Sequence, residues 1–126
     1  MQKIIITREK KFASAILPYW IITCISKQDF MLKHGFKEDL CEHERNGQAV
    51  SRIEINELDS IGIRIQNGET VEMIVDDDIN SFFACSMSGS LSNEVKMEGY
   101  ISHPIAIKLT TKGGFKTVSY PFLTRD

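Results

Sequence analysis

The sequence predicts an all-β protein: an antiparallel β-sandwich of about seven to nine strands with one short helix near residues 26–34. Two observations carry this prediction. In several short runs, apolar residues alternate with polar ones, which places the apolar side chains on one face of a pleated strand. Turn-forming residues separate these runs at short, regular intervals, as in sandwiches and barrels. No linker or repeat divides the 126 residues, so we expect a single domain over 1–126.

The N-terminal part predicts two strands and the helix. Lys3–Thr7 is a short apolar run that ends in charged residues. Phe12–Cys24 is rich in Ile and aromatic residues, which favours a strand over a buried helix. Pro18 lies within it and requires an edge or a bulge, because proline cannot donate to a ladder. Ser26 is suited to cap the helix that follows, and Gly35 to end it in a left-handed conformation.

The stretch from residue 36 to residue 60 is the most polar of the chain. Alternating Ile residues in Arg52–Asn56 predict a strand there. An Asn46-Gly47 turn would pair that strand with Leu40–Glu44. Residues 56–60 are expected to form a loop or a single helical turn.

Residues 61–75 carry the clearest pattern of the sequence. Two alternating runs flank a turn at Asn67-Gly68, a pair that readily adopts the positive backbone angles of a tight hairpin. A β-hairpin with one buried face is therefore predicted. Its inward residues would be Ile61, Ile63, Ile65, Val71, Met73 and Val75.

Four more strands are expected toward the C-terminus. Ser81–Met87 is followed by a Ser/Gly turn and then by the short strand Asn93–Met97. Pro104–Thr110 and Phe115–Tyr120 flank Lys112–Gly114, which predicts a terminal hairpin.

Composition limits the classes of function. The formal net charge of −2 argues against nucleic-acid binding, which needs a clustered basic surface. No apolar run has the ~20 residues of a membrane span, and no signal-peptide pattern is present. The three cysteines form no Cys-x-x-Cys pair and suit free thiols in a reducing compartment. A cytoplasmic location without membrane contact is expected.

The order of motifs resembles a group of small bacterial β-sandwich domains similar to PEGA-like or carboxypeptidase-regulatory-like modules. The resemblance covers Lys3–Thr23 and Ile61–Leu109, and rests on Arg8-x-Lys-x-Phe-Ala, Asn67-Gly-Glu and Ser92-Asn-Glu. It implies a fold and little about function. In this chain, residues 24–60 replace a short loop of that pattern, and a Gly-His element is absent after the outgoing strand. A specialised function would be expected in this insertion, because loops on a rigid scaffold carry much of protein function.

The insertion contains the one cluster of metal-competent side chains. On a strand at Leu40–Glu44, Cys41 and His43 would point to the same side. With a third ligand from His34 or His103, they would make a zinc site. No spacing here matches a known zinc pattern, so a solvated polar segment is the preferred reading and no cofactor is expected.

Adjacent aromatic residues offer a second candidate surface. Neighbours on a strand point to opposite faces, so one of Tyr19 and Trp20, and one of Phe82 and Phe83, should face outward. Exposed aromatic rings of this kind can stack on a sugar or on a partner protein. The alternative, that these side chains are covered, is favoured because large aromatics dominate ordinary cores.

These patterns predict a non-enzymatic interaction or binding module of a bacterial cytoplasm, which could form a homodimer through an edge strand. The main alternative is a small carbohydrate- or metabolite-binding domain that uses the exposed aromatics. A third hypothesis is a metal-dependent enzyme with its site in residues 24–60.

Overall fold

The computed structural model describes residues 2–11, 17–36, 41–48, 52–97, 104–113 and 119–125, apart from the side chains of residues 42 and 43. The described part of the chain is mostly β and contains three helices. Its strands are β1 (Gln2–Arg8), β2 (Tyr19–Ile22), β3 (Gly62–Ile65), β4 (Thr70–Val75), β5 (Ser81–Ser86), β6 (Val95–Lys96), β7 (Ile105–Lys112) and β8 (Tyr120–Arg125). Its helices are α1 (Lys27–Lys33), α2 (Glu42–Asn46) and α3 (Ile55–Ile61), all between β2 and β3. None of these helices has the length and apolar character that crossing a membrane requires.

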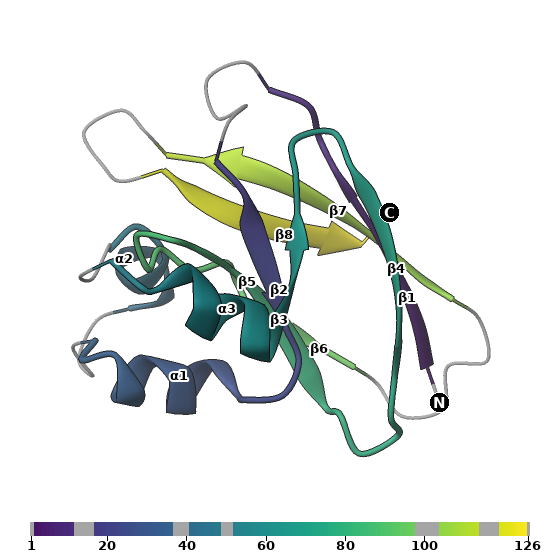
Figure 1. Cartoon of the computed structure of the whole chain (residues 1–126), viewed down its shortest axis with the longest axis horizontal. Helices are drawn as coiled ribbons and strands as arrows, with labels where there is room; N and C mark the ends of the chain where they lie inside the picture. The colour runs from purple at the N-terminus through teal and green to yellow at the C-terminus, as the bar shows by residue number, and fades with distance from the viewer. Residues whose placement is uncertain are drawn as a thin grey trace.

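The strands form two four-stranded sheets (Figure 1). The open sheet has the order β4-β1-β7-β8, and the covered sheet has the order β3-β2-β5-β6. Every strand pair is antiparallel except β1 with β7, which run parallel. The prediction of a purely antiparallel fold is therefore wrong at this pair. Parallel neighbours need a long crossover, and here most of the chain lies between residues 8 and 105.

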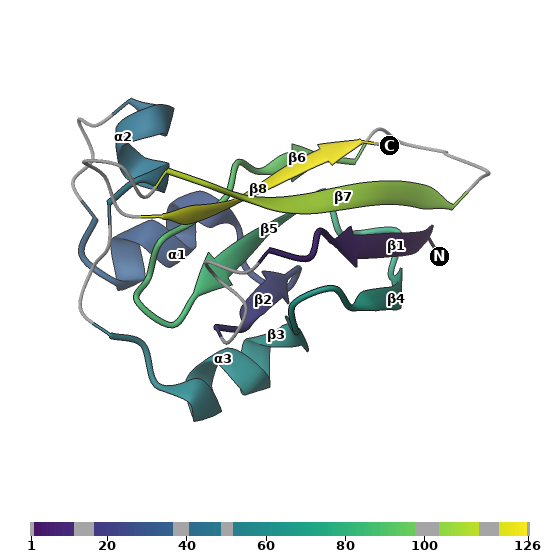
Figure 2. The same cartoon turned by 90° about the horizontal axis from the view of Figure 1, so that it is seen from above.

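Apolar side chains from both sheets meet in one core (Figure 2). The strand alternation of the open sheet sends every second residue into it, as in the burial pattern of β7. The buried residues of this core are Ile4, Ile6, Tyr19, Ile21, Ile65, Met73, Val75, Phe82, Ala84, Ile105, Ile107, Leu109 and Leu123.

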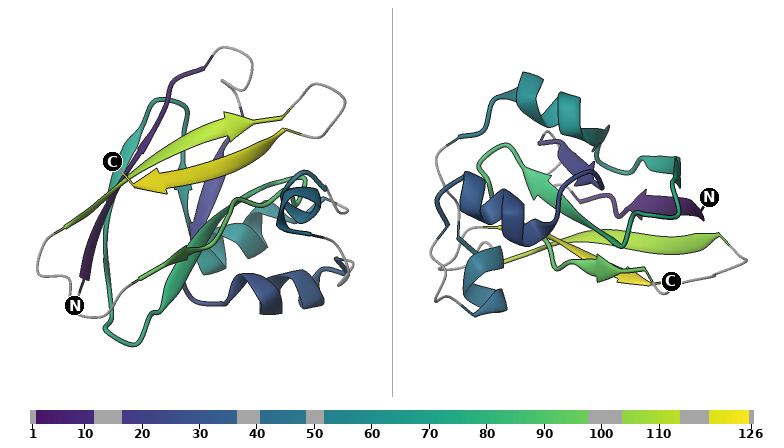
Figure 3. Two further views of the ribbon diagram at one scale, coloured as in Figure 1. Left: turned by 180° about the vertical axis from the view of Figure 1, so that it is seen from behind. Right: turned by 90° about the horizontal axis from the view of Figure 1, so that it is seen from below.

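A second core lies on the other face of the covered sheet, where α1 and α3 pack (Figure 3). It joins outward-facing sheet residues to the apolar faces of the helices and to the segments beside them. Its buried members are Trp20, Ile22, Phe30, Met31, Phe36, Ile53, Leu58, Phe83, Cys85 and Leu91. Strands β2 and β5 are therefore buried on both faces.

The turn at Asn67-Gly68 exists, but the predicted hairpin does not. Gly68 has a φ of +77°, as expected for this turn. However, β3 pairs with β2 in the covered sheet, whereas β4 pairs with β1 in the open sheet. The turn thus carries the chain from one sheet to the other. Ile65 is buried, whereas Ile63, on the same edge strand, is 42% exposed.

Two strands predicted in the insertion at residues 24–60 are wrong. The predicted strand Arg52–Asn56 is wrong, because α3 begins at Ile55. Ile55, Leu58 and Ile61 recur every three residues, and this helical spacing presents them to the covered sheet. The predicted strand Leu40–Glu44 is also wrong, because α2 begins at residue 42; residue 40 lies outside the described residues.

Other predicted elements are confirmed. The helix near residues 26–34 is α1, where the Asp29 N–H donates to Ser26 Oγ at 3.1 Å. Gly35 follows it with a φ of +78°. Strands β1 and β5 agree, within one residue at each end, with the predicted strands Lys3–Thr7 and Ser81–Met87. The predicted terminal hairpin is confirmed in part: β7 pairs with β8, but β8 begins at Tyr120, where the predicted strand ends, and residues 115–118 lie outside the described part. The long second strand is confirmed only over β2, because residues 17–18 and 23–24 are not in a strand and residues 12–16 lie outside the described part.

Candidate functional site

A pocket of about 580 Å³ lies beside α1, within reach of α2 and of the residue that precedes β6. Most of its wall belongs to the insertion at residues 24–60. The lining residues are Lys27, Gln28, Met31, Leu32, Phe36, Arg45 and Glu94. The pocket therefore combines an apolar wall with three ionisable side chains.

Glu94 fixes the first turn of α1 against the covered sheet. Its Oε2 accepts hydrogen bonds from the Lys27 backbone N–H at 3.1 Å and from Ser81 Oγ at 2.8 Å. Its Oε1 lies 3.0 Å from the Lys96 ammonium. Burial opposes ionisation of this carboxyl, but the donors from Lys27, Lys96 and Ser81 outweigh burial and hold the pKa of Glu94 below its usual value. Glu94 is thus a carboxylate whose two oxygens are already engaged.

Lys27 joins α1 to α2. Its side chain is 6% exposed, and its Nζ donates to Asn46 Oδ1 at 2.6 Å. This contact lies between the first turn of α1 and the last residue of α2, so it holds the two helices that border the pocket at a defined separation.

Arg45 differs from the other two charged residues of the pocket. Its Nε is buried and has no hydrogen-bond partner. Among the described residues, no hydrogen bond or ion pair engages its guanidinium. A buried, unpaired donor on a charged group is costly, so this position favours an acceptor supplied from outside the chain.

The remaining wall is apolar. Met31 and Phe36 belong to the second core and are buried, whereas Leu32 is 52% exposed at the pocket rim. Among the described lining residues there is no Cys, Ser, Thr or His, and their one carboxylate, Glu94, is held by three donors. These described residues can bind a small molecule.

Of the predicted metal ligands, the structure describes the side chains of His34 and Cys41. His34 stacks on Phe30 with ring centroids 4.4 Å apart, and its Nε2 lies 3.4 Å from Glu57 Oε1. Cys41 is exposed at the start of α2. The side chain of His43 and the whole of His103 lie outside the described residues. Within the described part, no group of three metal-competent side chains is found.

The favoured prediction for the adjacent aromatic residues, that their side chains are covered, is confirmed, and the candidate exposed aromatic surface is wrong. Tyr19, Trp20, Phe82 and Phe83 are all buried, because the second sheet covers one side of each pair and the helices cover the other. The Tyr19 hydroxyl lies 2.8 Å from Thr111 Oγ1.

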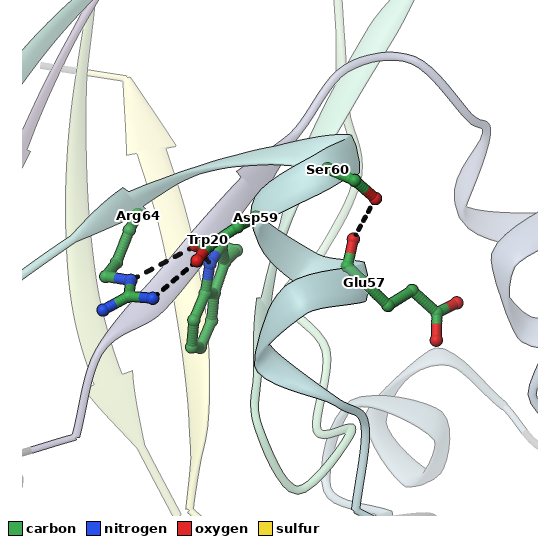
Figure 4. A network of polar contacts seen from close by, with 5 residues as sticks. All are labelled: Trp20, Glu57, Asp59, Ser60 and Arg64. Carbon is green, nitrogen blue, oxygen red and sulfur yellow. Dashed lines mark hydrogen bonds and ion pairs between the residues drawn. The ribbon is translucent and has the colours of Figure 1, made fainter.

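Trp20 belongs to a polar network that holds α3 on the sheet (Figure 4). Its Nε1 donates to Asp59 Oδ1 at 2.8 Å, and Arg64 Nη2 donates to Asp59 Oδ2 at 2.7 Å. Hydrogen bonds from Trp20 and Arg64 hold the pKa of Asp59 below its usual value. Every group in this network has a partner, so it serves the fold.

The pocket residues were missed in the sequence because they share no motif. Arg45 lies in a run of charged residues that is typical of a solvated segment. Glu94 lies 67 residues away from Lys27, and only the pairing of β5 with β6 brings its carboxylate to α1.

Comparison of the chain with family models, with curated proteins and with solved structures gave no match. The resemblance to PEGA-like modules therefore stays a prediction.

Proposed function

We propose that this chain is a non-enzymatic binding module, a β-sandwich whose helical insertion holds a small molecule in the pocket beside α1. The pocket itself carries the proposal. Its volume falls within the ~300–1,000 Å³ range of small-molecule sites, and an apolar wall with a few polar groups is their usual lining. A bacterial cytoplasmic setting is part of this proposal and rests on the cysteine pattern.

The chemistry of the lining favours binding over catalysis. A hydrolytic or transfer site needs a nucleophile and a base within hydrogen-bond reach. The pocket residues supply neither. The metal-dependent alternative has less support, because the described His34 and Cys41 share no partner.

The test uses a neutral apolar dye, N-phenyl-1-naphthylamine, whose fluorescence rises in apolar surroundings. We expect one dye molecule to bind per chain. Leu32→Trp, which fills the rim of the pocket, should abolish binding. Ile74→Trp, at an exposed apolar position on β4, is the matched control and should bind as the wild type does. Equal binding by both variants would contradict the proposal.

A second candidate is association with another protein, including a second copy of this chain, through the outer face of the open sheet. No described helix covers that face (Figures 1 and 2), and Ile74 is 66% exposed on it. Light scattering coupled to gel filtration tests this candidate. A dimer that Ile74→Lys converts to a monomer would favour it, and a wild-type monomer at all concentrations would remove the homodimer.

A further inference from the structure

We propose that the ligand of the pocket is a small organic anion with an apolar body, and that the Arg45 guanidinium binds its anionic group. This inference rests on the proposed function, because it concerns the same pocket. It adds the sign of the ligand's charge and the residue that recognises it.

The first step is the state of Arg45. It is half-buried as a residue, and its Nε is buried without a hydrogen-bond partner, although a buried polar group ordinarily has one. The planar guanidinium presents its donors in a fork that matches a carboxylate, phosphate or sulfonate. An anionic ligand would supply the acceptor that the described residues do not.

The second step is the balance of charge in the pocket. Among the described residues that line it, two are cations, Lys27 and Arg45, and one is a carboxylate, Glu94, so these three side chains together carry one positive charge. Glu94 is neutralised by Lys96 and bound by two further donors. The carboxylate is therefore poorly available to a cationic ligand, whereas the Arg45 guanidinium is available to an anion.

The third step is the apolar wall. Met31, Leu32 and Phe36 line the same pocket as Arg45. A fully hydrated inorganic ion would leave this wall in contact with water. A ligand with an apolar body would cover Leu32, which is half exposed in its absence. The combination of wall and guanidinium thus fits an amphipathic acid better than a sugar or a simple ion.

The experiment compares two dyes that share one apolar body. 8-Anilinonaphthalene-1-sulfonate carries a sulfonate, and N-phenyl-1-naphthylamine is the same ring system without it. We expect wild type to bind the sulfonate at least about tenfold more tightly, as a charge-assisted hydrogen bond implies. Arg45→Gln should remove this preference and leave the affinity for the neutral dye unchanged.

Arg52→Gln is the matched control, because Arg52 is exposed and does not line the pocket. It should keep the preference. Arg45→Lys should keep part of it, since the charge remains but the fork is lost. Octanoate should displace the sulfonate dye, and 1-octanol should do so at least about tenfold less well. Thermal melts of each variant verify that the fold is intact.

The two proposals fail in different ways. Binding of the neutral dye that Leu32→Trp abolishes, together with equal sulfonate binding by Arg45→Gln and wild type, would overturn this inference alone. Binding of neither dye to the wild type would overturn the proposed function and this inference with it. Should Arg45→Gln prove unfolded, the octanoate and octanol competition on the wild type decides, and equal displacement by the two overturns the inference.

Discussion

The two sheets of this protein differ in what covers them. The covered sheet has the opposite sheet on one face and α1 and α3 on the other, so β2 and β5 are buried along most of their length. The open sheet has a core on its inner face, and its outer face carries exposed residues such as Lys3, Glu72 and Lys108. Single strands reflect this difference: β7 of the open sheet alternates apolar and polar residues, whereas β2 and β5 of the covered sheet are nearly continuous apolar runs.

The apolar pattern of a strand indicates how many of its faces are buried. Alternation in β7 indicates one buried face, and the structure confirms it. A continuous run such as Tyr19–Ile22 reports two buried faces, and its aromatic pair should not be interpreted as half exposed. The pattern does not indicate which element packs on the second buried face of the strand.

The largest expected loss of stability comes from truncating a phenylalanine side chain of the covered sheet, compared with one of the open sheet. Phe83 lies fully buried between the covered sheet and Phe30, whereas Phe122 lies half-buried on the outer face of the open sheet. Phe83→Ala should lower the free energy of unfolding by about 3–5 kcal/mol, and Phe122→Ala by less than half as much. Urea denaturation measures both. Equal losses would mean that the outer face of the open sheet is covered as well.

A second pair of variants compares a buried and a partly exposed isoleucine within the edge strand β3. Ile65 is fully buried on β3, and Ile63 is nearly half exposed two residues earlier. Ile65→Ala should cost about 2–5 kcal/mol, and Ile63→Ala about 1 kcal/mol or less. The measurement is the shift of the urea denaturation midpoint, with the dependence of the unfolding free energy on urea concentration unchanged. If Ile63→Ala lowered the free energy of unfolding more than Ile65→Ala does, Ile63 would be a core residue, as the alternation alone predicts.

A third variant tests the link between the two sheets. The Asn93 side chain precedes β6 and pairs with the backbone of Leu123 in β8, both as donor and as acceptor at 2.8 Å. Asn93→Ala leaves both groups of Leu123 without a protein partner and should cost about 1–3 kcal/mol. Asn80→Ala, at an exposed position, serves as the control and should be close to neutral by thermal unfolding.

The smallest expected effect on stability depends on pH and concerns Asp59, which holds α3 on the covered sheet. The folded-state pKa of Asp59 is lowered by Trp20 and Arg64, so its ionised form stabilises the fold above the usual aspartate pKa of about 3.9. That contribution disappears as the pH falls through the lower folded value. Asp59→Asn should therefore be less stable than wild type near neutral pH, and the gap should close below about pH 4. Unfolding followed by the fluorescence of Trp20, the only tryptophan, measures it.

Local structure was largely predictable from the sequence, but strand partners were not. The turn residues Gly35 and Gly68 adopt the positive φ angles that their positions predict. Pairing of β3 with β2 instead of β4 is a tertiary choice, because either pairing satisfies the same alternation. Helix α3 was predicted only as a loop or a single helical turn at residues 56–60, because Ile53 and Ile55 suggest a strand, although Leu58 and Ile61 continue the spacing of a helix.

The candidate site was less predictable than the fold. The insertion was expected to carry it, and most of the pocket wall does belong to the insertion. The residues chosen there, His34, Cys41 and His43, were selected for metal affinity. Arg45 was not chosen, although it lines the pocket and its buried Nε has no hydrogen-bond partner. An arginine among charged neighbours gives no sequence signal, because burial without a partner is a property of the packed chain.

The position of β1 at the centre of the open sheet has a consequence for how the protein folds. Its neighbours are β4, which pairs Thr70 with Thr7, and β7, which pairs Ile105 with Ile4. These pairs are separated by 63 and 101 residues, and such non-local pairing slows folding to the range of about milliseconds to seconds. During synthesis, β1 is made before both of its partners, and one edge of β1 stays unpaired until residues 105–109 have left the ribosome.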